Sequence, residues 1–219
     1  MTQLFTSAAR ELQLAGPGAQ HADNVPGIRE IAHSLSYVNR FTGHASRGYS
    51  VAEHSLLVMM IARNVFGASP AAQLAALMHD AHECITGDTT SPVKQVLGSA
   101  WAQFEAIHEH AVRKSYGLLG VFEQHGAMIK KCDLIALATE RRDLLPYVHH
   151  WHTPWPVLDA PGAKVLAWND VNLQTPPPFD MVSTFEDAAL ELMDQAKYEL
   201  CVAITSQADS ERTARIRGK

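Results

Sequence analysis

The sequence has no long apolar run, and its 219 residues include only three cysteines. The longest apolar stretch runs from Leu56 to Ala62 and ends at Arg63, far short of the roughly 18–20 residues that cross a membrane. Three cysteines without a Cys-x-x-Cys spacing do not make a disulfide framework, and they favour a reducing compartment. The first residues lack a basic segment followed by an apolar one, so no secretory leader is expected. These absences predict a cytoplasmic protein with no membrane partner.

An excess of basic residues is also missing, because the formal net charge is −5. Proteins that bind nucleic-acid polymers usually present a basic face, so we expect no such partner. A glycine-rich phosphate loop of the ATPase type is absent as well. The chain does contain 47% apolar residues, 19% charged residues and twelve histidines. This composition can bury a core, and the number of histidines suggests a metal site.

Hydrophobic spacing and capping signals predict a mostly helical chain. Ser50 to Glu53 has the form of a capping box, so a helix should run from there to about Asn64. Ser69-Pro70 opens another helix, which is expected to continue unbroken to about Ile85. Four further helices are expected over about 28–38, 99–116, 126–145 and 183–204, the last from a second capping box at Ser183.

These elements form one helical core over residues 28–205, preceded by a loosely attached N-terminal arm over 1–27 and followed by a polar tail over 206–219. The segment 147–178 is rich in proline and tryptophan, and we expect an ordered loop insertion there. No segment alternates for long enough to require a sheet. The predicted fold class is therefore all-α.

Chemistry-bearing residues occur in three of the expected helices. Asp80 lies three residues before Glu83 and His79 four, so i+3 and i+4 spacing on a helix would let each converge with Glu83. His54 lies on the apolar stripe of its helix, and Asp133 lies among apolar neighbours on the helix over 126–145. Two imidazoles and two carboxylates together suit a divalent transition-metal ion, because a buried carboxylate needs a cation or a paired donor.

Each residue also has a simpler interpretation. Taken singly, His54 is better explained as a core or capping histidine, and Asp133 could pair with Lys130. His82 is expected to pack or bond locally rather than to bind a metal. His108 and His110 could add ligands for a second ion, but residues two apart point to different helix faces, so a solvated surface is the simpler interpretation.

The run His54, His79-Asp80 and Asp133 resembles the HD-domain phosphohydrolase superfamily, whose members hold a divalent metal with an H…HD…D set. The flanking motifs look like the 5′-deoxynucleotidase branch and the related phage-type deoxynucleoside triphosphate hydrolases; they are Asn39-Arg40-Phe41, Tyr49 to Ser55, and His79 through Asp88 to Lys94. The resemblance covers about residues 28–145. It implies an all-α, HD-domain (PDEase-like) helical bundle.

The resemblance implies a role for each matching position. The implied ligands of one divalent ion (Co²⁺, Mn²⁺, Fe²⁺, Ni²⁺ or Zn²⁺) are His54, His79, Asp80 and Asp133. The implied catalytic acid–base groups are Glu83 and Asp88. The implied substrate-binding residues are Arg40, Phe41, Lys94 and Lys130, with Phe41 standing where many relatives carry tryptophan.

The activity implied by the resemblance is hydrolysis of a deoxynucleoside 5′-monophosphate to deoxynucleoside and phosphate, by a homo-oligomer. Lys94 and Lys130 keep a second enzyme open, a deoxynucleoside triphosphate triphosphohydrolase or pyrophosphatase that uses the same pocket. A third interpretation is a non-catalytic nucleotide-binding scaffold. Glu83 and Asp88 argue against the scaffold, because a purely structural ion requires neither of them.

Overall fold

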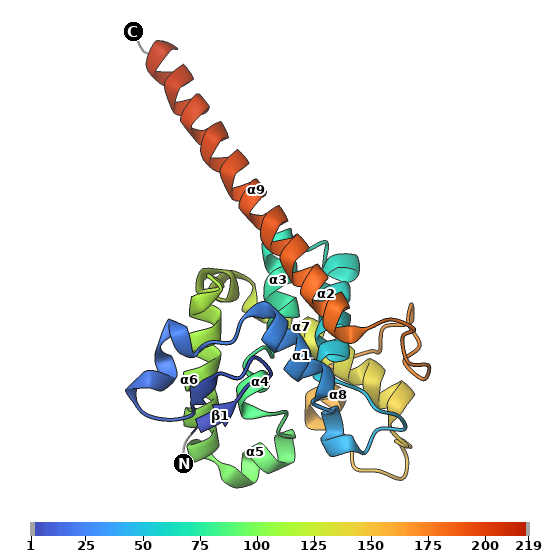
Figure 1. Ribbon diagram of the computed structural model, residues 1–219. Coiled ribbons are helices and arrows are strands. Elements are labelled where there is room, and N and C mark those ends of the chain that lie inside the picture. The colour runs from blue at the N-terminus through green and yellow to red at the C-terminus, as the bar shows by residue number, and fades with distance from the viewer. Residues whose placement is uncertain (1–2, 218–219) are drawn as a thin grey trace.

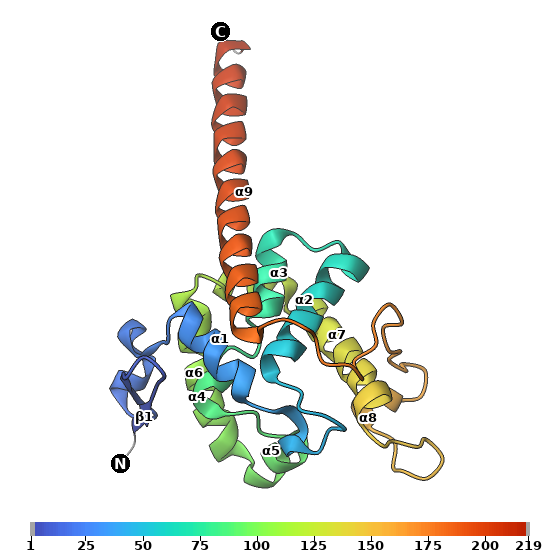
Figure 2. The same ribbon diagram turned by 45° about the vertical axis from the view of Figure 1, so that its right-hand side comes forward.

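The computed structural model describes residues 3–217, with side chains described for residues 3–200. As predicted, the architecture is all-α, and the helices surround a buried apolar core (Figures 1 and 2). The helices are α1 (Ile28–Tyr37), α2 (Val51–Phe66), α3 (Pro70–Leu77), α4 (Glu83–Thr86), α5 (Ser91–Leu97), α6 (Ser99–Ser115), α7 (Leu119–Leu144), α8 (Pro156–Asp159) and α9 (Met181–Arg217). Within residues 3–217, the one sheet is an antiparallel pair, β1 (Gln3–Phe5) and β2 (Glu11–Gln13).

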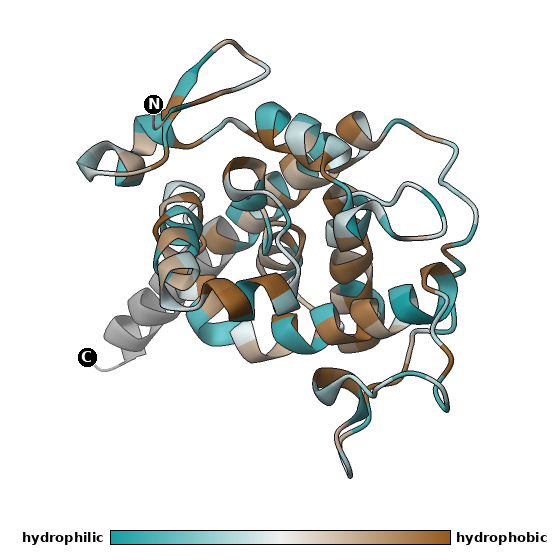
Figure 3. Cartoon of the chain, turned by 90° about the horizontal axis from the view of Figure 1, so that it is seen from below, coloured by the Kyte–Doolittle hydropathy of each residue, from teal (hydrophilic) through white to brown (hydrophobic). Residues whose placement is uncertain are grey.

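Helix α2 lies at the centre of the bundle, where it packs against α3 and α7. Its predicted capping box is confirmed: Ser50 Oγ accepts from the Glu53 N–H at 3.2 Å, and Glu53 Oε1 accepts from the Ser50 N–H at 3.3 Å. Val58 and Ile61 are fully buried, as is His54 one turn earlier on the same helix. Figure 3 shows apolar and polar residues interleaved along the helices, as expected for helices that bury one face. The packing of α2 therefore carries His54 into the core.

The chain after α3 differs from the predicted continuous helix over 71–85. Helix α3 ends at Leu77, and tight turns over 78–82 precede α4. Ala81, Glu83 and Cys84 donate their backbone N–H groups to carbonyls three residues back, as in a 3₁₀ turn. His79 Nδ1 donates to the Ala76 carbonyl at 2.9 Å, which a continued helix would have paired with the N–H of residue 80. The argument that helical spacing aligns His79 with Glu83 is therefore wrong, since the helix is interrupted between them.

Other helix ends also differ from the predictions. Helix α7 begins at Leu119, well before the expected start at 126, and α5 was not predicted. The cap of α9 is Asp180, whose Oδ2 accepts from the Ser183 N–H at 2.9 Å, so the predicted capping box at Ser183 is wrong. The reason is that Asp180 is a strong capping residue three positions upstream of Ser183.

Helix α9 extends far beyond the other helices. Its first turns bury Phe185, Ala189 and Leu192 against α1 and α3, and the spacing of these residues defines one helical face. The helix continues to Arg217, past the expected end near Ile204, and it projects away from the bundle in both views (Figures 1 and 2). Residues 206–217 of the expected polar tail therefore continue this helix, and residues 218–219 lie outside the described part.

Both flanking segments are attached to the bundle. In the N-terminal arm, Leu12 is buried, and the Leu14 carbonyl accepts from His108 Nε2 at 3.2 Å. His108 is thus fully buried, so its expected place on a solvated surface is wrong, whereas His110 is exposed. The arm covers this part of α6, which explains why residue spacing on α6 alone did not reveal the burial.

The segment 147–178 is anchored on the C-terminal half of α7. Arg141 donates to both carboxylate oxygens of Asp159, at 2.6 and 2.8 Å. Thr139 Oγ1 accepts from the Trp168 N–H at 2.9 Å. These contacts make the insertion an ordered loop. Among residues 3–217, no helix has the length and apolar character needed to cross a membrane.

Candidate metal centre

The four predicted metal ligands come from α2, the turn after α3, and α7, and three of them, His54, His79 and Asp80, offer ligand atoms within 4.8 Å of one another. His54 Nε2 lies 3.2 Å from His79 Nε2, 3.6 Å from Asp80 Oδ2 and 3.4 Å from Asp133 Oδ1. Asp80 Oδ2 lies 3.1 Å from His79 Nε2. The histidine side chains are buried, whereas the two carboxylates are each 20% exposed, so the cluster is accessible from the carboxylate side.

Both imidazoles use Nδ1 to reach groups that accept hydrogen bonds. Glu140 Oε1 lies 2.6 Å from His54 Nδ1, and the Ala76 carbonyl lies 2.9 Å from His79 Nδ1. Neutral rings that donate from Nδ1 present bare Nε2 lone pairs to each other and to the carboxylates. That arrangement is unfavourable unless a proton or a metal ion lies among these atoms. Ligand atoms bound about 2.1 Å from one ion lie about 3 Å apart. The spacings among His54, His79 and Asp80 are close to this value, so these three residues could hold a divalent metal, with Asp133 next to them through its contact with His54.

The charges around His54 favour a cation at this position. Burial and the guanidinium of Arg40 would lower the pKa of His54, but the carboxylates of Glu140 and Asp133 raise it to about 9. Burial alone would raise the pKa of Asp80, whereas the adjacent His79 holds it well below its usual range. Without a metal ion, a proton on an imidazole provides the positive charge that these carboxylates require.

Asp133 has a second partner besides His54. Its Oδ2 accepts from Lys130 Nζ at 2.7 Å, and the Lys130 side chain is 67% exposed. The two interpretations offered for Asp133 are therefore compatible, since one carboxylate oxygen faces the histidine and the other pairs with lysine. Lys130 lies at the rim of the cluster.

Glu140 is a buried member of the site that the sequence did not reveal. It is fully buried on α7, and its second oxygen accepts from Arg40 Nη2 at 3.1 Å. Burial would raise its pKa, but Arg40 and His54 keep the pKa of Glu140 below its ordinary value, so it is a carboxylate. Its position seven residues after Asp133, on the same face of one helix, was the available signal. Glu140 joins a predicted metal ligand to a predicted phosphate-binding residue.

Arg40 and Phe41 lie in a short 3₁₀ segment, Arg40–Gly43. Phe41 and Thr42 both have positive φ angles, 56° and 53°, which are strained for residues with a Cβ and are concentrated at functional sites. Arg40 Nη1 lies 3.9 Å from Asp80 Oδ2, while its buried Nε has no hydrogen-bond partner. The Arg40 guanidinium lies 5.4 Å from the centre of the Phe41 ring. Arg40 therefore keeps a free donor beside the cluster.

Glu83 and Asp88 are acidic groups in the same electrostatic environment. Burial raises the pKa of Glu83 well above its usual value, and the charges of Asp80 and Asp88 add to this effect. Burial also raises the pKa of Asp88, with a further contribution from Asp80. Glu83 is 3% exposed, and its Oε2 has no hydrogen-bond partner. Both carboxyl groups therefore hold a proton more tightly than a solvent-exposed carboxyl group does.

Lys94 is held by a carboxylate on the neighbouring helix. Its Nζ lies 2.5 Å from Glu105 Oε1, and His82 Nε2 lies 3.5 Å from the same oxygen. Contacts with the His82 imidazole and the Lys94 ammonium lower the pKa of Glu105 to about 2. His82 thus interacts locally, as expected.

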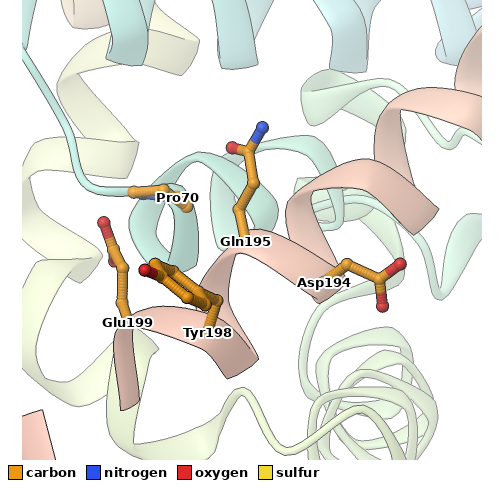
Figure 4. Close-up of a pocket in the computed structure, with 5 residues that line it drawn as sticks. All are labelled: Pro70, Asp194, Gln195, Tyr198 and Glu199. Carbon is orange, nitrogen blue, oxygen red and sulfur yellow. The ribbon is translucent and has the colours of Figure 1, made fainter. Parts of the chain in front are cut away.

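A surface hollow elsewhere on the molecule contains none of the predicted site residues. It lies between α9 and the start of α3 (Figure 4), and its lining residues are Pro70, Asp194, Gln195, Tyr198 and Glu199. Its lining lacks the convergent histidines and carboxylates of the cluster. The predicted metal ligands lie instead where α2, the end of α3 and α7 pack together.

Comparison with known proteins finds a family that matches part of the chain. Residues 29–125 match the family described as 5′-deoxynucleotidase YfbR-like. Uncharacterized protein YfdR of Escherichia coli (strain K12) is 40% identical over 117 residues, which are 53% of this chain and 60% of that protein. An uncharacterized protein of Rhodobacter capsulatus is 38% identical over 117 residues, which are 52% of this chain and 58% of that protein.

The match therefore spans less than two thirds of either relative's length. The family segment includes His54, the His79-Asp80 pair, Glu83 and Asp88, whereas Asp133 and Glu140 follow it in the chain. The family expected from the motifs is the one that matches. The segment 29–125 is accordingly similar to the 5′-deoxynucleotidase YfbR-like family.

Proposed function

We propose that this protein is a metal-dependent phosphohydrolase that cleaves a deoxynucleoside 5′-monophosphate to deoxynucleoside and phosphate. The strongest support is the convergence of two histidine Nε2 atoms and two carboxylates beside Arg40, whose buried Nε lacks a partner. The description of the matching family supports the substrate class. One ion of Co²⁺, Mn²⁺, Fe²⁺, Ni²⁺ or Zn²⁺, bound by His54, His79, Asp80 and Asp133, would polarise a phosphoryl oxygen and make water more acidic.

The other predicted site residues transfer protons or bind the substrate. Glu83, buried and with a free carboxyl oxygen, positions the attacking water and accepts its proton. Asp88 acts as the second acid–base group near the leaving oxygen. Arg40 donates to the phosphate from a guanidinium that Glu140 fixes at Nη2. Phe41 offers an aromatic face to the deoxyribose.

The lysines favour a monophosphate over a triphosphate. Lys94 is paired with Glu105 at 2.5 Å, and Lys130 is paired with Asp133 at 2.7 Å. Additional phosphates would have to draw both ammonium groups away from their carboxylates, whereas a single phosphate can be held by Arg40. We therefore propose a monophosphate as the substrate, and we extend the proposal to a homo-oligomer in the cytoplasm.

A direct assay tests the proposal. The purified full chain is incubated with Mn²⁺ or Co²⁺ and either dAMP or dATP, and the phosphate product is identified. Release of orthophosphate from dAMP is the expected result. Tripolyphosphate or pyrophosphate released from dATP, with dAMP left intact, would replace the proposal by the triphosphate-cleaving alternative. No turnover of any deoxynucleotide with any of the five metals would favour the non-catalytic scaffold.

Glu140→Gln is expected to weaken metal binding by about 10- to 100-fold, because Glu140 orients His54 and strengthens its Nε2 as a ligand. Metal affinity is measured by competition with a chelator, and the absorption spectrum of the Co²⁺ form reports the ligand geometry. Glu53→Gln is the matched control, since Glu53 also pairs with an arginine, Arg47, at 2.8 Å but lies outside the cluster. Equal affinity in the two variants would show that Glu140 does not position His54.

A further inference from the structure

A second set of metal-type donors lies beside the first cluster. One ligand atom each from His82, Glu83 and Glu105 lies within 4.8 Å of the others. His82 precedes α4, Glu83 begins it, and Glu105 comes from α6, so two elements that pack together supply the three groups. An imidazole and two carboxylates are ligands that Mn²⁺, Fe²⁺ and Zn²⁺ accept.

One of these donors is buried without a partner, and a second has only a long contact. Glu83 Oε2 makes no hydrogen bond although Glu83 is only 3% exposed, and His82 Nε2, in a side chain that is also buried, reaches only Glu105 Oε1 at 3.5 Å. Buried polar atoms are normally paired, and an unpaired carboxylate oxygen is especially unfavourable. A cation that both atoms could coordinate would remove this cost. The free Glu83 oxygen and the weakly paired His82 nitrogen therefore point to a cation that accepts lone pairs from oxygen and nitrogen.

The Lys94 ammonium supplies part of the positive charge that the Glu83 and Glu105 carboxylates require, and a metal ion could displace it. This ammonium lies 2.5 Å from Glu105 Oε1, but it contacts the cluster from α5, a helix with no buried residue. The Lys94 side chain is itself 32% exposed. Moving it into solvent would leave the core packing unchanged. His82, Glu83 and Glu105 would then form an acidic cluster without a counter-charge.

We propose that His82, Glu83 and Glu105 form a second cation site, which takes a divalent ion such as Mn²⁺ in exchange for the Lys94 ammonium. This site is separate from the donor set of His54 and Asp133. Its ion binding does not depend on which phosphate ester the protein cleaves. Glu83 is also the proposed catalytic base, so an ion bound here would take the Glu83 oxygen that is otherwise free for water.

Counting bound ions tests the site. The full chain is titrated with Mn²⁺ alone while free Mn²⁺ is followed by electron paramagnetic resonance, and two ions per chain are expected. Glu105→Gln is expected to bind one ion. Asp133→Ala is also expected to keep one, because it removes a ligand from the other cluster. Glu109→Gln, which changes a carboxylate on α6 that pairs with Arg113, is the matched control and should keep both ions.

Lys94→Met gives the sharper test. Loss of the competing ammonium, 2.5 Å from a ligand oxygen, is expected to tighten the second site by about tenfold or more. If wild type and Lys94→Met both bind one ion per chain at saturating Mn²⁺, the second site does not exist, and the cluster serves only to anchor Lys94.

Folding and turnover separate this inference from the proposed function. Thermal unfolding checks each variant, and His82→Gln replaces Glu105→Gln if the latter fails to fold. One ion per chain with normal dAMP hydrolysis would overturn the second site alone. Two ions per chain without hydrolysis of any nucleotide would support the second site and contradict the proposed function.

Discussion

Asp80→Asn is expected to abolish metal binding at the first cluster and to lower phosphate release from dAMP by at least about a thousandfold, equivalent to about 4 kcal/mol of transition-state stabilisation. Asp80 Oδ2 lies within 3.1 Å of one histidine Nε2 and 3.6 Å of the other, so it belongs to the centre of the donor set. Asparagine has the same shape but lacks the negative charge. The measurements are metal content by elemental analysis and the initial rate at saturating metal.

Asp159→Asn is the control for this change. Asp159 is also a largely buried aspartate, but it pairs with Arg141 in the insertion and lies outside the metal donor set. A metal at a hundred times its dissociation constant stabilises a folded protein by about 2.7 kcal/mol, which raises the melting temperature. That rise should persist in Asp159→Asn and disappear in Asp80→Asn. Retention of both the rise and the rate in Asp80→Asn would exclude Asp80 as a metal ligand.

Short capping motifs in the sequence correctly predicted helix starts that are stabilised by hydrogen bonds between neighbouring residues. The capping box at Ser50 and the Ser69-Pro70 start both appear in the structure as expected, because each is satisfied by hydrogen bonds within one turn. The unbroken helix through His79 was wrong for a related reason. The His79 side chain takes the carbonyl of Ala76 while its Nε2 faces His54, so a tertiary contact accompanies the end of the helix.

Of the candidate site, only the residues that belong to recognisable sequence motifs could be predicted. The four-residue donor set followed from a resemblance to a family, since no periodicity along one helix joins residues 54, 79 and 133. The partners of Glu140 could not be inferred, because His54 and Arg40 are 86 and 100 positions away in the chain, although its place on the Asp133 face of the helix was a signal. The pairing of Lys94 with Glu105 and the burial of His108 under the N-terminal arm likewise depend on contacts between separate elements. Such contacts become visible only when the elements are packed.

Glu83→Gln is expected to lower kcat by about 10²- to 10⁴-fold while the first cluster keeps its metal, because glutamine preserves the size of the side chain but cannot accept a proton. Glu83 follows the His79-Asp80 turn directly, is almost fully buried and has a carboxyl oxygen with no protein partner. That free oxygen is available to a water beside the cluster, whereas Asp80 and Asp133 have oxygens facing the histidines.

The decisive comparison is between kcat and metal occupancy in Glu83→Gln. A base that acts on the attacking water affects the chemical step, so KM for dAMP should change little while kcat collapses. An unchanged kcat would remove Glu83 from the proton path and leave Asp88 as the remaining candidate. Loss of metal from His54, His79, Asp80 and Asp133 in the same variant would instead make Glu83 a support for the ion. Since Glu83 has a buried carboxyl oxygen without a hydrogen-bond partner, its carboxylate is expected to act on water and not on the metal's own ligands.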